Sequence, residues 1–146
     1  MDMEAAMKRI PPHSAEAEQA VLGAMLMNKE AITVASEILS GDDFYQTAYG
    51  ILFNSMVELF HAGKPVDLIT LQEYLKEKDV PSEISSMEFA RDLLMGTQTS
   101  ANIKSYAEIV REKSIMRRLI KVNEETANAC SVSYTHLRAH ETDSYL

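Results

Sequence analysis

The sequence predicts an all-α protein: a helical-bundle head of about five helices, followed by one long projecting helix. Apolar residues recur three and four positions apart through most of the chain, and no stretch alternates at period two for long enough to form a convincing strand. Residues 99–129 contain neither Gly nor Pro and would form one helix roughly 45 Å long, which is longer than a compact domain of this size needs.

The first predicted helix covers residues 15–27. Pro11 and Pro12 exclude a helix that runs through them, and Ser14 is a suitable N-cap for the helix that follows. This helix is apolar on nearly all sides, which predicts burial in the middle of the bundle. Gly23 within it indicates either the close approach of a neighbouring helix or a neutral substitution.

The next two helices are predicted over residues 29–39 and 47–62. Their apolar residues recur at helical spacing, and the link between them carries Phe44 and Tyr45, which we expect to plug the edge of the core. Gly63 supplies the left-handed position that commonly ends a helix. The third helix therefore has a clear stop signal.

Two shorter helices complete the head. Asp67 is the expected N-cap of a fourth helix, which ends near Lys78. Ser85 and Glu88 have the spacing of a capping box that opens a fifth helix, and this helix ends at Gly96.

The long sixth helix, which Thr99 or Ser100 would cap, turns its apolar residues in two directions. In its first half they form a proximal stripe: Ile103, Tyr106, Ala107 and Val110. In its second half they form a distal apolar stripe, rotated by more than a third of a turn: Ile115, Met116, Leu119 and Val122. Basic residues then occupy the side that the first half uses for burial, and we call them the basic stripe: Lys113, Arg117, Arg118 and Lys121.

Two interpretations of the long helix stay open. It could be a bent helix with a solvated basic face. Alternatively, it could be a projecting arm that buries its distal apolar stripe against a partner helix, either in the same chain or in another copy. In the second case the four apolar residues are a candidate self-association interface, and the four basic residues are a candidate partner-binding surface.

Charge is distributed unevenly along the 146 residues, whose net charge is -8. Residues 1–100 carry 7 basic and 16 acidic side chains, whereas residues 101–121 carry 6 basic and 2 acidic ones. Because phosphate binding needs positive charge clustered on one face, an acidic head is poorly suited to grip DNA over its whole surface. Any contact with nucleic acid would involve the basic arm, and an acidic protein partner suits that arm equally well.

Other classes of protein are disfavoured by composition. No apolar run approaches the length of a membrane span, and the first residues lack the apolar core of a signal peptide. The single cysteine, Cys130, cannot form an intrachain disulfide, so we expect a cytoplasmic protein and interpret Cys130 as a small apolar residue near a helix end.

No catalytic or metal site is predicted. His61 is favourably placed at a helix C-terminus, but no nucleophile accompanies it. His136 and His140 have the spacing of two ligands on a helix, yet Leu137 and Ala139 stand where zinc-protease motifs require Glu. An enzyme with its own active site is therefore the least favoured class.

The expected domain organisation has three parts. Residues 1–12 form a flexible lead-in, and residues 13–130 form the helical domain. Helical amphipathicity stops after residue 130, and residues 131–146 are predicted to be a non-native or disordered tail, of the kind that ends truncated reading frames.

Four stretches together resemble the N-terminal domain of bacterial DnaB-type replicative DNA helicases. They are RIPPHSAEAEQAVLGAML at 9–26, DFY at 43–45, PVDLITL at 65–71 and ANIKSYAEIVREKSIMRRLI at 101–120. The resemblance covers about residues 9–129 in the right order. Between residues 79 and 90 the chain has VPSEISSMEF where the family often carries a Gly-Gly turn, so the surface of the head there is expected to differ.

The resemblance implies a collar domain that assembles a hexameric helicase. In that family the long helix is the first arm of a helical hairpin, the domains pair through their hairpins into a trimer of dimers, and the collar receives primase and, in some members, helicase loaders. ATP and Mg²⁺ are implied only for a motor domain, through which the parent protein would also contact DNA. No G-x-x-x-x-G-K-[ST] loop occurs here, so this chain alone should neither bind ATP nor unwind DNA.

Two alternatives to a collar domain remain. One is a stand-alone helical regulator that binds a helicase or another acidic partner through the basic arm. The other is a DNA binder of the helix-turn-helix type, built from the fourth and fifth helices. The link between those helices is longer than the tight turn of that motif, and the acidic head would oppose phosphate contact.

Overall fold

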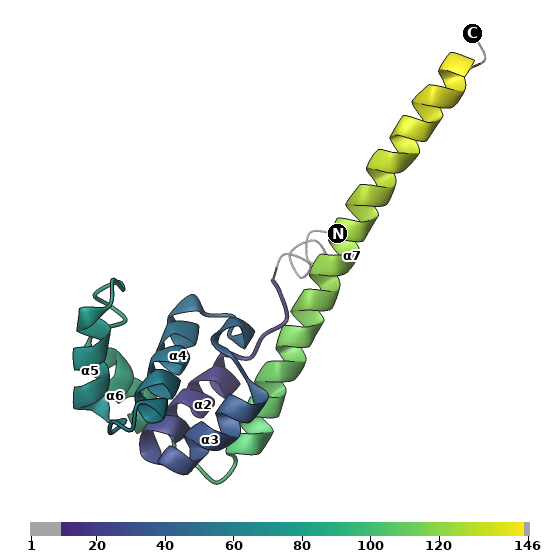
Figure 1. Cartoon of the computed structure of the whole chain (residues 1–146). Coiled ribbons are helices and arrows are strands. Elements are labelled where there is room, and N and C mark those ends of the chain that lie inside the picture. The colour runs from purple at the N-terminus through teal and green to yellow at the C-terminus, as the bar shows by residue number, and fades with distance from the viewer. Residues whose placement is uncertain (1–9, 145–146) are drawn as a thin grey trace. The chain divides into compact units, whose positions relative to one another are not determined.

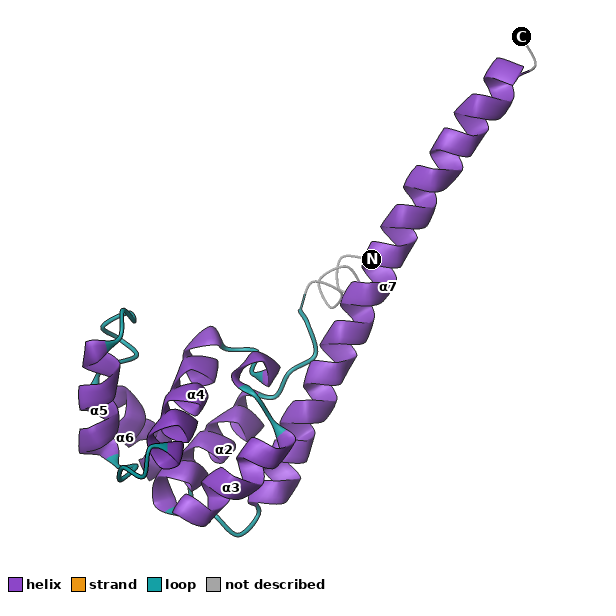
Figure 2. Cartoon of the chain, viewed as in Figure 1, coloured by secondary structure: helices purple, strands orange, loops and turns teal. Residues whose placement is uncertain are grey.

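The computed structural model describes the backbone of residues 10–144 and the side chains of residues 10–135, and every regular element in this range is helical (Figure 2). The elements are α2 (Ala15–Met27), α3 (Lys29–Ile38), the 3₁₀ turn η1 (Gly41–Asp43), α4 (Thr47–His61), α5 (Leu68–Glu77), α6 (Met87–Met95) and α7 (Ile103–Ser144) (Figure 1). Five helices followed by one long helix confirm the predicted all-α class.

The chain divides into two compact units between Ser114 and Ile115. We call residues 10–114 the head and residues 115–144 the distal segment, and each is described by itself. The head holds one apolar core, to which α2, α3, α4, α5, α6 and the first turns of α7 all contribute buried side chains.

Helix α2 is the centre of the head. It packs against α3, α4 and α6, and five consecutive residues, 21–25, are buried. Burial of consecutive residues means that no face of this part of the helix is left to solvent, as its apolar sequence predicts.

Gly23 lies where α6 ends against α2. A Cβ atom at this position would lie 1.6 Å from the Thr97 Oγ1 atom and 2.7 Å from the carbonyl oxygen of Leu93. Both distances are shorter than any real contact, so the structure supports close approach rather than a neutral substitution.

Most helix ends follow the predicted signals. The Ser14 Oγ atom accepts from the N–H of Ala17 at 3.2 Å, and the Asp67 carboxylate accepts from the N–H of Thr70 at 2.8 Å. Gly63 has φ 72°, and the N–H of Lys64 donates to the carbonyl of Leu59 at 3.0 Å. Gly63 therefore closes α4 with the bonding pattern of a Schellman motif.

Three local predictions are wrong. The N-cap of α6 is Ser86 rather than Ser85, because the Ser86 hydroxyl is the one that accepts from the N–H of Phe89. Helix α7 begins at Ile103, since Thr99 and the residues after it form a turn in which the Thr99 hydroxyl accepts from the N–H of Ala101. Tyr45 is exposed and stacks on the ring of His13, and only its neighbour Phe44 enters the core.

The far end of α7 also differs from the prediction. The helix continues past residue 129 to Ser144, although amphipathicity is lost there. Two statements about domain organisation stay predictions. One is that residues 131–146 are a non-native or disordered tail, and the other is that the domain bounds lie at 12 and 130.

Candidate interaction surfaces

The proximal stripe of α7 packs into the head, as its spacing predicts. Ile103, Ala107 and Val110 are buried, and Tyr106 is half-buried against the same core. These residues recur three and four apart, so they form one face of the helix.

Polar side chains extend this contact by one further turn of α7. The Arg111 guanidinium donates to the carbonyl oxygen of Ile38 at 2.9 Å, and the Ser114 hydroxyl donates to the Asp43 carboxylate at 2.7 Å. Neither bond can be found from local sequence patterns, because the partners are more than seventy residues apart in the chain.

The distal apolar stripe is exposed. Ile115, Met116, Leu119 and Val122 are all solvent-accessible, and Leu119 has an exposed fraction of 58%. The adjacent Ile120 is exposed as well, and it was missed because the predicted stripe followed a single helical face. The structure therefore brings the four predicted residues onto one accessible stretch of helix, while their role in self-association stays a prediction.

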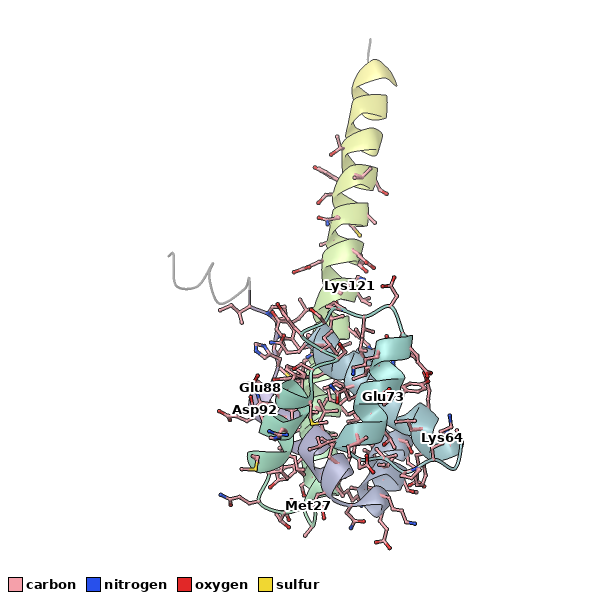
Figure 3. All side chains as sticks on the ribbon, turned by 90° about the vertical axis from the view of Figure 1, so that its left-hand side faces the viewer. Met27, Lys64, Glu73, Glu88, Asp92 and Lys121 are labelled. Atoms are coloured by element: carbon pink, nitrogen blue, oxygen red, sulfur yellow. The ribbon has the colours of Figure 1, made fainter. Side chains whose placement is uncertain are left out.

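The basic stripe lies on the same part of α7. Lys113 and Arg117 are half-buried, whereas Arg118 and Lys121 are exposed; Lys121 is labelled in Figure 3. Their role in binding a partner stays a prediction.

An ion pair with an aromatic neighbour joins α4 to the end of α5. The Lys78 ammonium lies 2.7 Å from the Glu58 carboxylate and 4.8 Å from the centre of the Tyr74 ring, and the Tyr74 hydroxyl also donates to Glu58. The bond from Lys78 is the main cause that lowers the pKa of Glu58, and Glu58 in turn raises the pKa values of Lys78 and Tyr74. The pKa shifts arise from an exposed ion pair between α4 and the end of α5. Exposed ion pairs of this kind contribute little to stability.

A surface pocket of about 430 Å³ opens between α2, α4 and α6. Its lining includes Tyr49 and Phe89, whose ring centres are 5.9 Å apart, and the acidic residues Glu16 and Asp92. Asp92 is labelled in Figure 3 beside Glu88, one turn away on α6. This pocket has no signal in the sequence, because the residues that line it come from three separate helices.

The remaining candidates give no further site. Among the side chains that the structure describes, no three His, Cys, Asp or Glu residues are grouped as a metal site would require. His136 and His140 lie outside those side chains. Cys130 is exposed, and it does not lie near a helix end as expected, because α7 continues to Ser144. No helix in the described part of the chain is both long and apolar enough to cross a membrane.

The fold of the head has known relatives. A family profile for the DnaB-like helicase N-terminal domain matches residues 10–112. This chain belongs to that family. The match covers all five head helices and the turn of α7 that carries Arg111.

Curated members of the DnaB-like family are longer than this chain. The replicative DNA helicase DnaC of Bacillus subtilis (strain 168) is 45% identical over 113 residues, which are 77% of this chain and 25% of that protein. The replicative DNA helicase DnaB of Pasteurella multocida (strain Pm70) is 41% identical over 121 residues, which are 83% of this chain and 26% of that protein. The chain thus spans about a quarter of the length of the curated relatives that it matches.

Solved structures of DnaB N-terminal domains share this fold. The domain from Mycobacterium tuberculosis superposes with a TM-score of 0.78 at 33% identity, covering 82% of this chain and 86% of that one. The domain from Helicobacter pylori, described together with its interactions with primase, superposes with a TM-score of 0.68 at 21% identity, covering 80% and 90%. The second likeness supports the fold alone.

Proposed function

We propose that this chain is the assembly and partner-docking domain of a hexameric replicative DNA helicase. The observation that carries the proposal is the run of exposed apolar side chains on α7, directly after a head that belongs to the DnaB-like family. Large apolar groups gathered on one exposed helix face are typical of a surface that another helix covers. In this proposal, the helix that covers the distal apolar stripe is the same segment of a second copy of the chain.

The proposal also places the parent protein's chemistry elsewhere. ATP hydrolysis with Mg²⁺ and the unwinding of duplex DNA belong to a motor domain, which would also make the contacts with DNA. The sequence of this chain lacks the phosphate-binding loop of such a motor, which is rich in glycine and ends in Lys and Ser or Thr. Its own contribution is to hold copies together in the cytoplasm of a bacterium and to present the collar to other replication proteins.

Primase is the first such partner. The relative from Helicobacter pylori is described with its primase interactions, and the basic stripe offers this chain a charged surface for a partner. Helicase loaders would use the same collar. A pull-down of purified primase on the full chain, with the Arg117→Glu and Arg118→Glu double variant beside it, tests whether the stripe contributes.

Leu119→Asp tests the assembly role directly. A carboxylate on the distal apolar stripe would have to be desolvated when a second copy covers it, so we expect self-association to be lost. Head stability should change little, because Leu119 is exposed in the single chain. Sedimentation velocity measures the first effect and circular dichroism the second.

Ile69→Asp is the matched control. Ile69 is an equally exposed large apolar residue, but it lies on α5 in the head. We expect this variant to self-associate like the unmodified chain. Unchanged dimer or hexamer content in Leu119→Asp would overturn the proposal.

A further inference from the structure

One turn of α7 holds the chain segment that joins α3 to η1. Arg111 and Ser114 are three positions apart and bind the two ends of residues 38–43 through Ile38 and Asp43, respectively. We call these four residues the polar clasp. Ile38 is the last residue of α3, so its carbonyl has no partner within that helix, and a cation there is also favoured by the helix dipole.

The Asp43 carboxylate serves both sides of the clasp. Its Oδ2 atom accepts from the backbone N–H of Ser40 at 2.8 Å, which starts η1, while its Oδ1 atom accepts from Ser114. Asp43 and Ser114 have exposed fractions of 4% and 2%. Loss of the bond would leave a carboxylate oxygen buried with one partner fewer, which is far less favourable than loss of an exposed contact.

The polar clasp lies at the end of the contact between α7 and the rest of the head. Among the side chains that the structure describes, Val110 is the last buried apolar residue of α7, and Ser114 is the last residue of the head. The final buried contact of α7 in the head is therefore a hydrogen bond between side chains. Such a bond is directional and short-ranged, so it is either made or broken, whereas an apolar contact can slide.

We propose that the polar clasp controls whether the turn at 111–114 is held in the head or released, with Asp43 and Ser114 as positioning residues. When the clasp is closed, the turn at 111–114 is held against residues 38–43, so the last turn of the head is a fixed base. When it opens, this turn is released while the proximal stripe stays packed. This inference rests on the proposed function, because a fixed base lowers the entropy lost when two copies pair through their distal segments.

Ser114→Ala in the full chain tests the clasp. Hydrogen exchange is measured on dilute, monomeric protein, so that this readout does not depend on self-association. Because a hydrogen bond to a charged group is lost, we expect the amides of residues 111–115 to exchange about tenfold to a hundredfold faster, with residues 103–108 unchanged. Sedimentation at higher concentration should show self-association weakened by about tenfold or more.

Two further variants complete the test. Ser105→Ala removes an exposed hydroxyl from the same helix and should change neither measurement. Asp43→Asn can keep its one oxygen for the Ser40 N–H and donate from its amide nitrogen to the Ser114 oxygen, so it should fall between Ser114→Ala and the unmodified chain. Unchanged exchange at residues 111–115 in Ser114→Ala would overturn the clasp. Faster exchange with unchanged self-association would overturn its control of pairing.

Different experimental results would contradict the polar clasp and the proposed function. If the unmodified chain does not self-associate at any concentration, the proposed function fails, and the exchange data alone decide whether the clasp holds the turn. If the chain associates and Leu119→Asp abolishes this, the proposed function is supported whatever Ser114→Ala does.

Discussion

Glu18 replaces a helix cap that the sequence does not supply. It lies on α2 with an exposed fraction of 1%, and its carboxylate accepts from the backbone N–H groups of Tyr45 at 2.9 Å and Gln46 at 3.2 Å. Gln46 is the N-cap of α4 and makes no cap bond with its own side chain. A carboxylate at a helix N-terminus is also favoured by the helix dipole, so this buried charge is both bonded and well placed.

A single methyl group at Gly23 should disturb the head. Because the new Cβ of Gly23→Ala would collide with Thr97 and with the Leu93 carbonyl, we expect a loss of about 1–3 kcal/mol in the free energy of unfolding. Gly96→Ala is the control, since its nearest contact would be 3.3 Å and its loss should be smaller. Urea denaturation measures both, and equal midpoints for the two variants would contradict the prediction.

Helix α5 depends on one carboxylate at its start. Asp67 accepts from the N–H of Thr70, and the Thr70 hydroxyl donates back to Asp67 while accepting from the Asp67 N–H at 3.0 Å. The backbone bond from Thr70 is the main cause that lowers the pKa of Asp67. A lowered pKa means that ionised Asp67 stabilises the folded state above its ordinary pKa, and that this contribution is lost as the pH falls through the folded value.

Replacement of the cap should therefore have a pH-dependent cost. At pH 7 we expect Asp67→Ala to lose about 1 kcal/mol of stability, the usual value for a lost N-cap. The difference from the unmodified chain should narrow as the pH falls below about 4. Asp67→Asn keeps the cap without a titrating group and should match the unmodified chain near neutral pH. Thermal unfolding over a pH series measures this, and a constant difference would contradict it.

Along the whole chain, positive charge is concentrated in residues 101–121, whereas residues 1–100 are acidic. Residues 101–121 carry 6 basic and 2 acidic side chains, against 7 and 16 in residues 1–100. A cluster of basic side chains favours acidic partners, and electrostatic attraction between exposed charges is sensitive to salt. The basic stripe is the place where this sensitivity should be concentrated.

Charge reversal within the basic stripe tests this distribution. The double variant Arg117→Glu and Arg118→Glu should bind poly-L-glutamate, a defined acidic probe, more weakly than the unmodified chain. The difference should be larger at 50 mM than at 500 mM salt, because the Debye length falls from about 14 Å to about 4 Å between these concentrations. Lys104→Glu, an exposed change on the same helix, is the control and should have a smaller effect. Fluorescence anisotropy measures the binding. If the difference in binding between the variant and the unmodified chain did not depend on salt, the basic stripe would be only a solvated helix face.

The sequence by itself determined the fold class and most helix bounds, because these depend on local signals. The 3.6-residue spacing of apolar side chains, Ser14 and Asp67 as caps and Gly63 as a stop all act within a few residues of their own position. The distal apolar stripe was predicted from the same periodicity. The start of α6 was misplaced because adjacent serines offer two equivalent caps, and only one hydroxyl meets the N–H of Phe89.

Only the tertiary structure decided which distant residues meet. The Glu18 bonds, the polar clasp and the pocket between α2, α4 and α6 join residues from separate helices. Without an observed fold, a buried acid such as Glu18 or Asp43 cannot be told from an exposed one, since the residue type alone favours the surface. Periodicity shows which face of a helix is buried, whereas the packing of the helices determines what lies against it.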